Sequence, residues 1–88
     1  MLQTEVTITN RLGLHARPAT KLVRIAASGK SDVFLSKDDQ RVNAKSILGV
    51  MLLEAGLGSK LKIEVDGEDE AEVMRQLVEL IRDKFGEE

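Results

Sequence analysis

The stretch Gly13-Leu14-His15-Ala16-Arg17-Pro18-Ala19-Thr20 decides how the first half of this chain folds, and it holds the only histidine and the only proline of the 88 residues. Proline is tolerated in the first turn of a helix and rarely deeper, because it lacks an N–H and its φ is fixed near the helical value. Apolar residues then recur with the i, i+3, i+4, i+7 spacing of an amphipathic helix, at Ala19, Leu22, Val23 and Ala26. The pattern predicts a helix that begins around Ala16 and ends near Ala27, with His15 at its N-cap.

That position gives His15 a specific chemical setting. The backbone N–H groups of a first helical turn have no partner within the helix, and the helix dipole makes this end positive. Such an end accommodates anions, and Arg17 adds a planar cation suited to phosphate. A nucleophilic ring nitrogen beside an anion site indicates a histidine that carries a phosphoryl group, held by the N–H groups of Ala16 and Arg17.

A simpler explanation stands beside this one, because a polar residue at a helix start commonly does no more than find a hydrogen bond. The composition favours the chemical interpretation, since the chain has no Cys, Tyr or Trp that could act as nucleophile or redox group in place of His15. One histidine without cysteine also disfavours a zinc site. No close acidic pair lies near His15 in the sequence to hold Mg²⁺, so we expect no bound ATP, metal or other cofactor.

Length and composition predict one domain that spans residues 1–88. The absence of cysteine fits a reducing compartment, and neither a signal peptide nor an apolar run of membrane-spanning length is evident. We therefore expect a soluble, cytoplasmic monomer.

The charge is distributed unevenly along the chain. Residues 1–46 carry eight Lys/Arg against four Asp/Glu, whereas residues 47–88 carry five against eleven. The basic half contains His15 and would steer an acidic partner or a phosphate toward it, although a solvated surface can vary this much by chance. Nucleic acid is disfavoured, because the basic residues are not interleaved with aromatic ones.

The rest of the chain alternates between strand and helix patterns. Strands are predicted at residues 2–8, 32–36, 41–43 and 60–65, the middle two as a hairpin. A helix rich in acidic residues at its start follows, with Gly86 as its end and a buried stripe formed by Met74, Leu77, Val78, Ile81 and Phe85. The order is strand, helix, strand, strand, helix, strand, helix. Strands with one apolar face each favour a mostly antiparallel sheet with helices on one side, an α+β fold.

The middle helix is predicted between Ser46 as N-cap and Gly56 beyond its end, over residues 47–55. Its apolar residues surround the axis almost completely. Val50 and Leu53 share one side, while Ile47, Leu48 and Met51 cluster on another. Either the helix is fully buried, or the second set forms an exposed docking patch.

Two segments together make the chain resemble a known family. His15-Ala16-Arg17-Pro18-Ala19 and Asn43-Ala44-Lys45-Ser46-Ile47 are similar to segments of HPr, the histidine-containing phosphocarrier of the bacterial phosphoenolpyruvate-dependent sugar phosphotransferase system. The resemblance covers essentially the whole chain. It implies an open-faced sandwich, with a four-stranded antiparallel sheet and three helices over one face.

The resemblance also implies a carrier rather than a stand-alone enzyme. His15 would take a phosphoryl group on Nδ1 from enzyme I and pass it to enzyme IIA domains, with Arg17 as the charge partner. Ser46 would be a regulatory site for an ATP-dependent HPr kinase/phosphorylase. We expect Thr20 and the patch of Ile47, Leu48 and Met51 to contact the partner proteins. Two other classes stay open: a binding module without chemistry, and a subunit that binds an anionic metabolite at the helix end.

Overall fold

Four antiparallel strands form one sheet in the computed structural model, which describes residues 1–87. Along the sheet the strands lie in the order β1 (Leu2–Thr7), β4 (Lys60–Asp66), β2 (Asp32–Lys37) and β3 (Gln40–Asn43). The first strand pairs with β4 from Leu2 opposite Val65 to Thr7 opposite Lys60. The predicted hairpin is β2 with β3, and its tight turn places Asp38 in the left-handed region at φ 54°. The α+β fold and the element order are confirmed.

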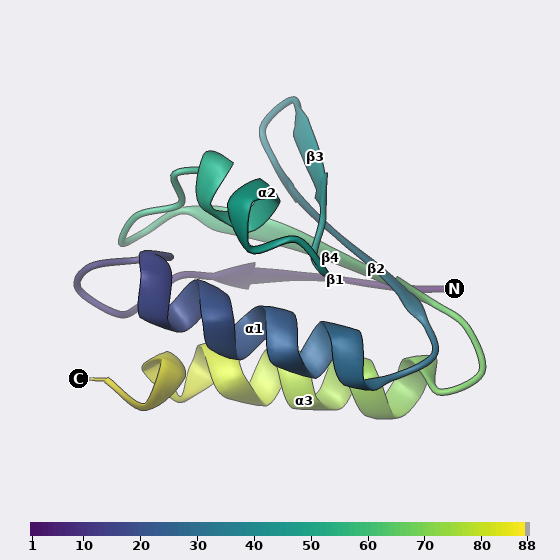
Figure 1. Ribbon diagram of the computed structural model, residues 1–88. Coiled ribbons are helices and arrows are strands. Elements are labelled where there is room, and N and C mark those ends of the chain that lie inside the picture. The colour runs from purple at the N-terminus through teal and green to yellow at the C-terminus, as the bar shows by residue number, and fades with distance from the viewer. Residues whose placement is uncertain (88) are drawn as a thin grey trace.

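Helices cover one face of this sheet and leave the other open (Figure 1). The two long helices, α1 (Ala16–Ser28) and α3 (Glu70–Arg82), run side by side in opposite directions below the sheet as drawn. The short α2 (Ile47–Leu52) lies above the first turns of α1 in the same view. A single 3-10 turn, η1 (Lys84–Gly86), follows α3 and brings the end of the chain beside the start of α1.

The hydrophobic core lies between the helices and the covered face of the sheet. One side of each helix and the inward-facing residues of the central strands β2 and β4 are buried in it, while β1 and β3 contribute the half-buried Val6 and Val42. The largest fully buried side chains are Phe85, Ile8, Leu22, Leu35, Leu53, Leu61, Ile63, Leu77, Ile81, Val33, Val50 and Val65.

Two predicted helix ends are wrong. The middle helix ends at Leu52 rather than near Ala55, because Glu54 adopts a left-handed conformation with φ 50°. The ammonium group of Lys37 caps this end, donating to the carbonyl oxygens of Leu53 at 3.0 Å and Glu54 at 3.1 Å. The last helix ends at Arg82, so Phe85 is buried from the 3-10 turn and not from the helix.

Details of the burial pattern also differ from the prediction. Val73 joins the buried stripe of α3, while Val78 is half-buried. On the open face of the sheet Glu64 is 8% exposed, although strand alternation predicts a solvated position. Arg41 explains the difference, since its Nε donates to the Glu64 carboxylate at 3.0 Å and its guanidinium lies 3.9 Å from the Phe34 ring centroid. None of the helices between residues 1 and 87 has the length and apolarity needed to cross a membrane.

Candidate functional site

The loop before α1 is held firmly and sets the place of His15. Gly13 has φ +68°, and a side chain on it would collide with the carbonyl of Ala55 and the Cα of Gly56. The backbone N–H of Leu14 donates to that same Ala55 carbonyl at 2.8 Å. Glycine is required here both for the left-handed conformation and for the close approach of the two loops. These contacts hold the loop in place, and the loop positions His15 directly before the first residue of α1.

The helix begins as predicted, with Ala16 as its first residue and His15 at the N-cap in an extended conformation. The side chain of His15 makes no capping bond to the helix. Within residues 1–87, the N–H groups of Ala16 and Arg17 donate no hydrogen bond. Pro18 is the third helical residue and has no N–H to offer. The first turn therefore leaves its N–H groups available at the residue that carries the imidazole.

The His15 ring lies at the surface and contacts the end of the chain. Its side chain is 37% exposed, and Nε2 lies 3.0 Å from Oε2 and 3.3 Å from Oε1 of Glu87. The Glu87 carboxylate also accepts a bond of 3.1 Å from the side-chain amide of the buried Asn10. Sequence reasoning missed Asn10 and Glu87, because nothing in the local pattern links the last turn of the chain to a histidine 72 positions earlier.

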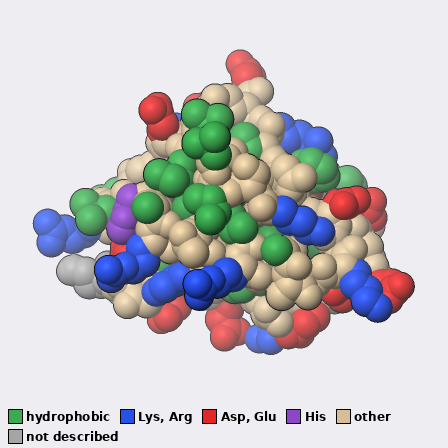
Figure 2. Space-filling view, viewed as in Figure 1, with side chains coloured by type: hydrophobic (Ala, Val, Ile, Leu, Met, Phe, Trp, Pro, Cys, Tyr) green, Lys and Arg blue, Asp and Glu red, His purple; other side chains and the backbone are tan. Residues whose placement is uncertain are grey.

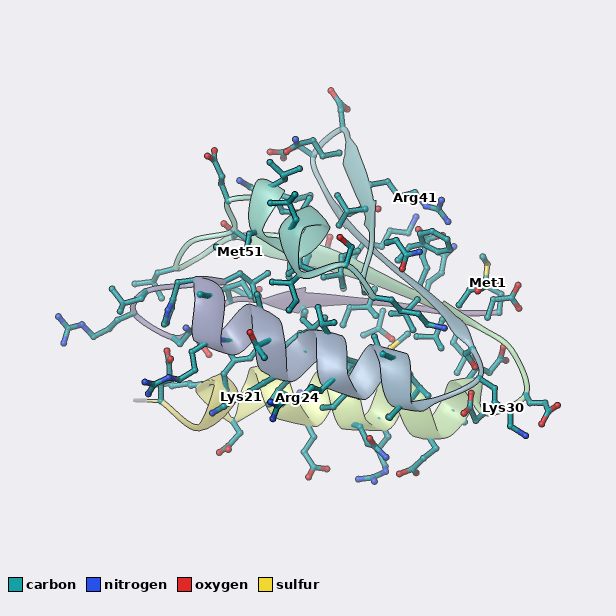
Figure 3. The ribbon with its side chains drawn as sticks, viewed as in Figure 1. Met1, Lys21, Arg24, Lys30, Arg41 and Met51 are labelled. Atoms are coloured by element: carbon teal, nitrogen blue, oxygen red, sulfur yellow. The ribbon has the colours of Figure 1, made fainter. Side chains whose placement is uncertain are left out.

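Basic side chains follow His15 along α1. A shallow hollow of about 430 Å³ is lined by Ala16, Arg17, Thr20, Lys21 and Arg24. Figure 3 places Lys21 and Arg24 along the same helix. Arg17 is exposed, while the Thr20 hydroxyl donates back to the Ala16 carbonyl at 2.8 Å and is only partly accessible. The structure thus brings Arg17 and Thr20 to one surface next to His15.

Ser46 is the N-cap of α2, as predicted, and it is exposed. Its Oγ accepts a hydrogen bond of 3.1 Å from the Gly49 N–H. Side-chain capping of this kind satisfies an N–H that the helix itself cannot pair. The hydroxyl is therefore at the surface and next to the exposed residues of α2.

The helix α2 is buried on one side only. Val50 and Leu53 are fully buried, whereas the opposite side is exposed, with Leu48 at 71%. We define the apolar patch as the exposed residues Ile47, Leu48, Met51 and Leu52 of α2 together with Leu12 and Leu57 of the neighbouring loops. Sequence reasoning found the first three members. Figure 2 shows the histidine between apolar side chains that gather over α2 and the Lys and Arg side chains along α1.

Comparison with known proteins places this site in a defined class. The family model described as "PTS HPr component phosphorylation site" matches residues 2–83. The phosphocarrier protein HPr of Cupriavidus necator is 51% identical over 87 residues, which cover 99% of this chain and 98% of that protein. The crystal structure of HPr from Thermoanaerobacter tengcongensis superposes with a TM-score of 0.96 at 44% identity, covering 100% of this chain and 99% of the other. An HPr dimer from the same organism gives a TM-score of 0.79 at 44% identity, covering 99% and 100%.

The fold and the matched phosphorylation-site segment define a small phosphocarrier of the phosphotransferase system. Within that class, the chain belongs to the HPr family. The resemblance seen in the sequence is thereby confirmed over the full length.

Proposed function

We propose that His15 accepts a phosphoryl group from phospho-enzyme I and passes it to enzyme IIA domains of the sugar phosphotransferase system. The observation that carries the proposal is an exposed imidazole at the N-cap of α1, beside first-turn N–H groups that make no bond within residues 1–87. Phosphoryl transfer depends mainly on positioning and on neutralising charge, which this arrangement supplies. The chain acts as a carrier of the phosphoryl group and not as a stand-alone enzyme.

In this proposal each group has one role. The neutral His15 ring uses the electron pair of Nδ1 to form the N–P bond, while the bond between phosphorus and the donor breaks and its electrons remain on the donor. The N–H groups of Ala16 and Arg17 receive the phosphoryl oxygens, and the Arg17 guanidinium balances their charge. An open site binds the phosphoryl group only moderately, so that the group can be released to the next protein.

The partners dock on the surface around His15. Thr20 and the basic residues of α1 meet the acidic surface of a partner, and the apolar patch supplies the buried contact.

The chain works as one domain and as a monomer in the cytoplasm. Size-exclusion chromatography with light scattering tests it, and a dimer mass at micromolar concentration would contradict it.

We further propose that Ser46 is phosphorylated by an ATP-dependent HPr kinase/phosphorylase. Ser46 is exposed and lies next to Ile47 at the border of the apolar patch. A phosphate brings about −1.5 to −2 charge to this border. That charge repels an acidic partner and slows transfer from enzyme I without unfolding the domain.

One labelling experiment decides between a carrier and the two other classes. Incubation with phosphoenolpyruvate and catalytic enzyme I should give one acid-labile, alkali-stable phosphate, which mass spectrometry under mild alkaline conditions locates on His15. His15→Ala should take up none, whereas Ser46→Ala serves as the matched control and should be labelled normally. Labelling of His15→Ala would overturn the proposal. A binding module would give no label at all, and an anion-binding subunit would instead bind a small molecule stoichiometrically.

A further inference from the structure

The segment that follows α2 is held by a side chain from the strand β2. Lys37 is the last residue of this strand, and its half-buried side chain reaches the end of α2. Its ammonium group donates to the carbonyl oxygens of Leu53 at 3.0 Å and Glu54 at 3.1 Å. No backbone N–H among residues 1–87 donates to either carbonyl. A helix leaves its last carbonyls without partners in the helix, so Lys37 supplies the donor that they need.

The backbone that Lys37 contacts is strained. Glu54 has φ 50°, a left-handed conformation that favours glycine. A residue other than glycine persists there because surrounding contacts hold it. The side chains of Leu53 and Ala55 are buried on either side, whereas that of Glu54 is exposed. The two bonds from Lys37 therefore fix the carbonyls of a turn that the Glu54 side chain does not anchor.

The next carbonyl along the chain holds the loop before α1. The Ala55 carbonyl accepts from the Leu14 N–H at 2.8 Å, and the backbone of Gly13 packs against it so closely that a side chain on Gly13 would collide with it. Leu14 directly precedes His15. Three consecutive carbonyls are thus bound in series, those of residues 53 and 54 by Lys37 and that of residue 55 by the loop. Their orientation connects the end of β2 to the start of α1.

We propose that Lys37 is a positioning residue for phosphoryl transfer, which fixes residues 53–55 and, through the Ala55 carbonyl, the loop that places His15. The inference deepens the proposed function and rests on it for its effect on the transfer rate. Phosphoryl transfer depends on placement, and a displacement of about 1 Å costs a reaction up to roughly a hundredfold in rate.

The same bonds also fix the end of α2, whose exposed residues belong to the apolar patch. Figure 1 shows the β2–β3 hairpin beside this helix. One ammonium group at the base of the hairpin thereby sets the position of the apolar patch relative to His15. A partner that contacts both needs this relative position to be constant.

Lys37→Met tests the inference, because methionine keeps an unbranched apolar stem and removes the ammonium group. Lys62→Met is the matched control, since Lys62 is an exposed lysine on the neighbouring strand β4. The first measurement is amide hydrogen exchange of the unphosphorylated protein by NMR, which does not depend on the carrier activity. In Lys37→Met the Leu14 amide should exchange roughly tenfold faster, while the amides of β4, which report unfolding of the whole domain, should change much less. Lys62→Met should leave the Leu14 amide unchanged.

The second measurement is the initial rate of phosphoryl uptake from phospho-enzyme I. We expect Lys37→Met to be roughly three- to tenfold slower and Lys62→Met to equal the unaltered protein. Circular dichroism checks that both variants are folded. The inference is overturned if exchange of the Leu14 amide in Lys37→Met rises no more than that of the β4 amides, or if the uptake rate of Lys37→Met equals that of the unaltered protein. If the unaltered protein takes up no phosphate, the proposed function fails instead, and the Leu14 amide alone decides whether Lys37 holds the loop.

Discussion

The three helices of this protein begin in three different ways. At α1 the N-cap is His15, whose side chain makes no bond to the helix, and the N–H groups of Ala16 and Arg17 donate to nothing within residues 1–87. At α2 the Ser46 hydroxyl accepts from the Gly49 N–H and so caps the helix with its own N-cap side chain. At α3 the N-cap Asp69 uses its carboxylate to bind the loop before β2. The comparison teaches that the N-cap side chain of α1 differs from the other two: it neither caps its helix nor binds a neighbouring loop, and its exposed ring lies beside the end of the chain.

Among variants that keep His15, the largest effect on the rate is expected from removing the cation at the start of α1. Arg17→Ala should slow phosphoryl transfer by about ten- to a hundredfold, because a charge-assisted hydrogen bond contributes roughly 1.5–3 kcal/mol. Stopped-flow or quench kinetics with phospho-enzyme I measures the effect. The exposed Lys45, which precedes Ser46 at the start of α2, provides the control, and Lys45→Ala should change the rate much less. Equal effects of the two variants would mean that overall positive charge matters and that the end of α1 does not.

A charge at the start of α2 should act through partner docking. Ser46→Asp places a negative group beside Ile47 and the rest of the apolar patch, and we expect about a tenfold lower rate of transfer from enzyme I. The effect should appear in KM and weaken at high salt, since it arises from repulsion at long range. Ser46→Asn caps the helix without charge and is the control. A rate for Ser46→Asp equal to that of Ser46→Asn would remove the electrostatic basis for regulation at this residue.

Exchanging the type of cap should change stability in opposite directions at the two helices. His15→Ser gives α1 a capping hydroxyl like that of α2 and should stabilise the fold by about 0.5–1 kcal/mol while abolishing phosphoryl uptake. Ser46→Ala removes a cap and should destabilise by about 1 kcal/mol, a fall in Tm of roughly 4–8 °C. Thermal and urea unfolding measure both. If His15→Ser is less stable than the unaltered protein, then the bond between His15 and Glu87 contributes more than the missing cap.

The helix starts could be predicted from sequence because their signals are local. Pro18 and Gly13 lie within three residues of His15, and Ser46 lies directly before its helix, so each signal acts over one turn. The one-sided burial of α2 was among the predicted alternatives for a similar reason. Val50 and Leu53 share one side of a regular helix whatever the rest of the chain does.

The features that could not be predicted depend on contacts between distant residues. The end of α2 is set by Lys37, which caps it from a strand 16 residues before Leu53. The contact of Glu87 with His15 depends on a turn of left-handed residues and joins positions 72 apart. The pattern of residues in a single sequence does not reveal such contacts, because they form only when the packing of the whole fold brings distant residues together.

The smallest effect is expected at α3, where the N-cap residue carries a carboxylate, and it concerns the pH dependence of stability. The Ser31 hydroxyl, and then the backbone N–H of Lys30, hold the pKa of the Asp69 carboxyl below its usual value of 3.8. The folded state thus favours ionised Asp69 more than the unfolded state does. Its contribution to stability is complete above about pH 4 and is lost as the pH falls through the lower value in the folded protein.

Asp69→Asn removes this titration, so its Tm should fall less steeply between about pH 5 and pH 2 than that of the unaltered protein. Glu68→Gln, one residue earlier and 78% exposed, is the control and should keep the original slope. Differential scanning calorimetry across this range measures the three slopes. If Asp69→Asn keeps the slope of the unaltered protein, the acid sensitivity comes from other carboxylates. One such group is Glu72, where Arg75 lowers the pKa to about 2. In that case the start of α3 would owe its stability to packing and not to the charge of its cap.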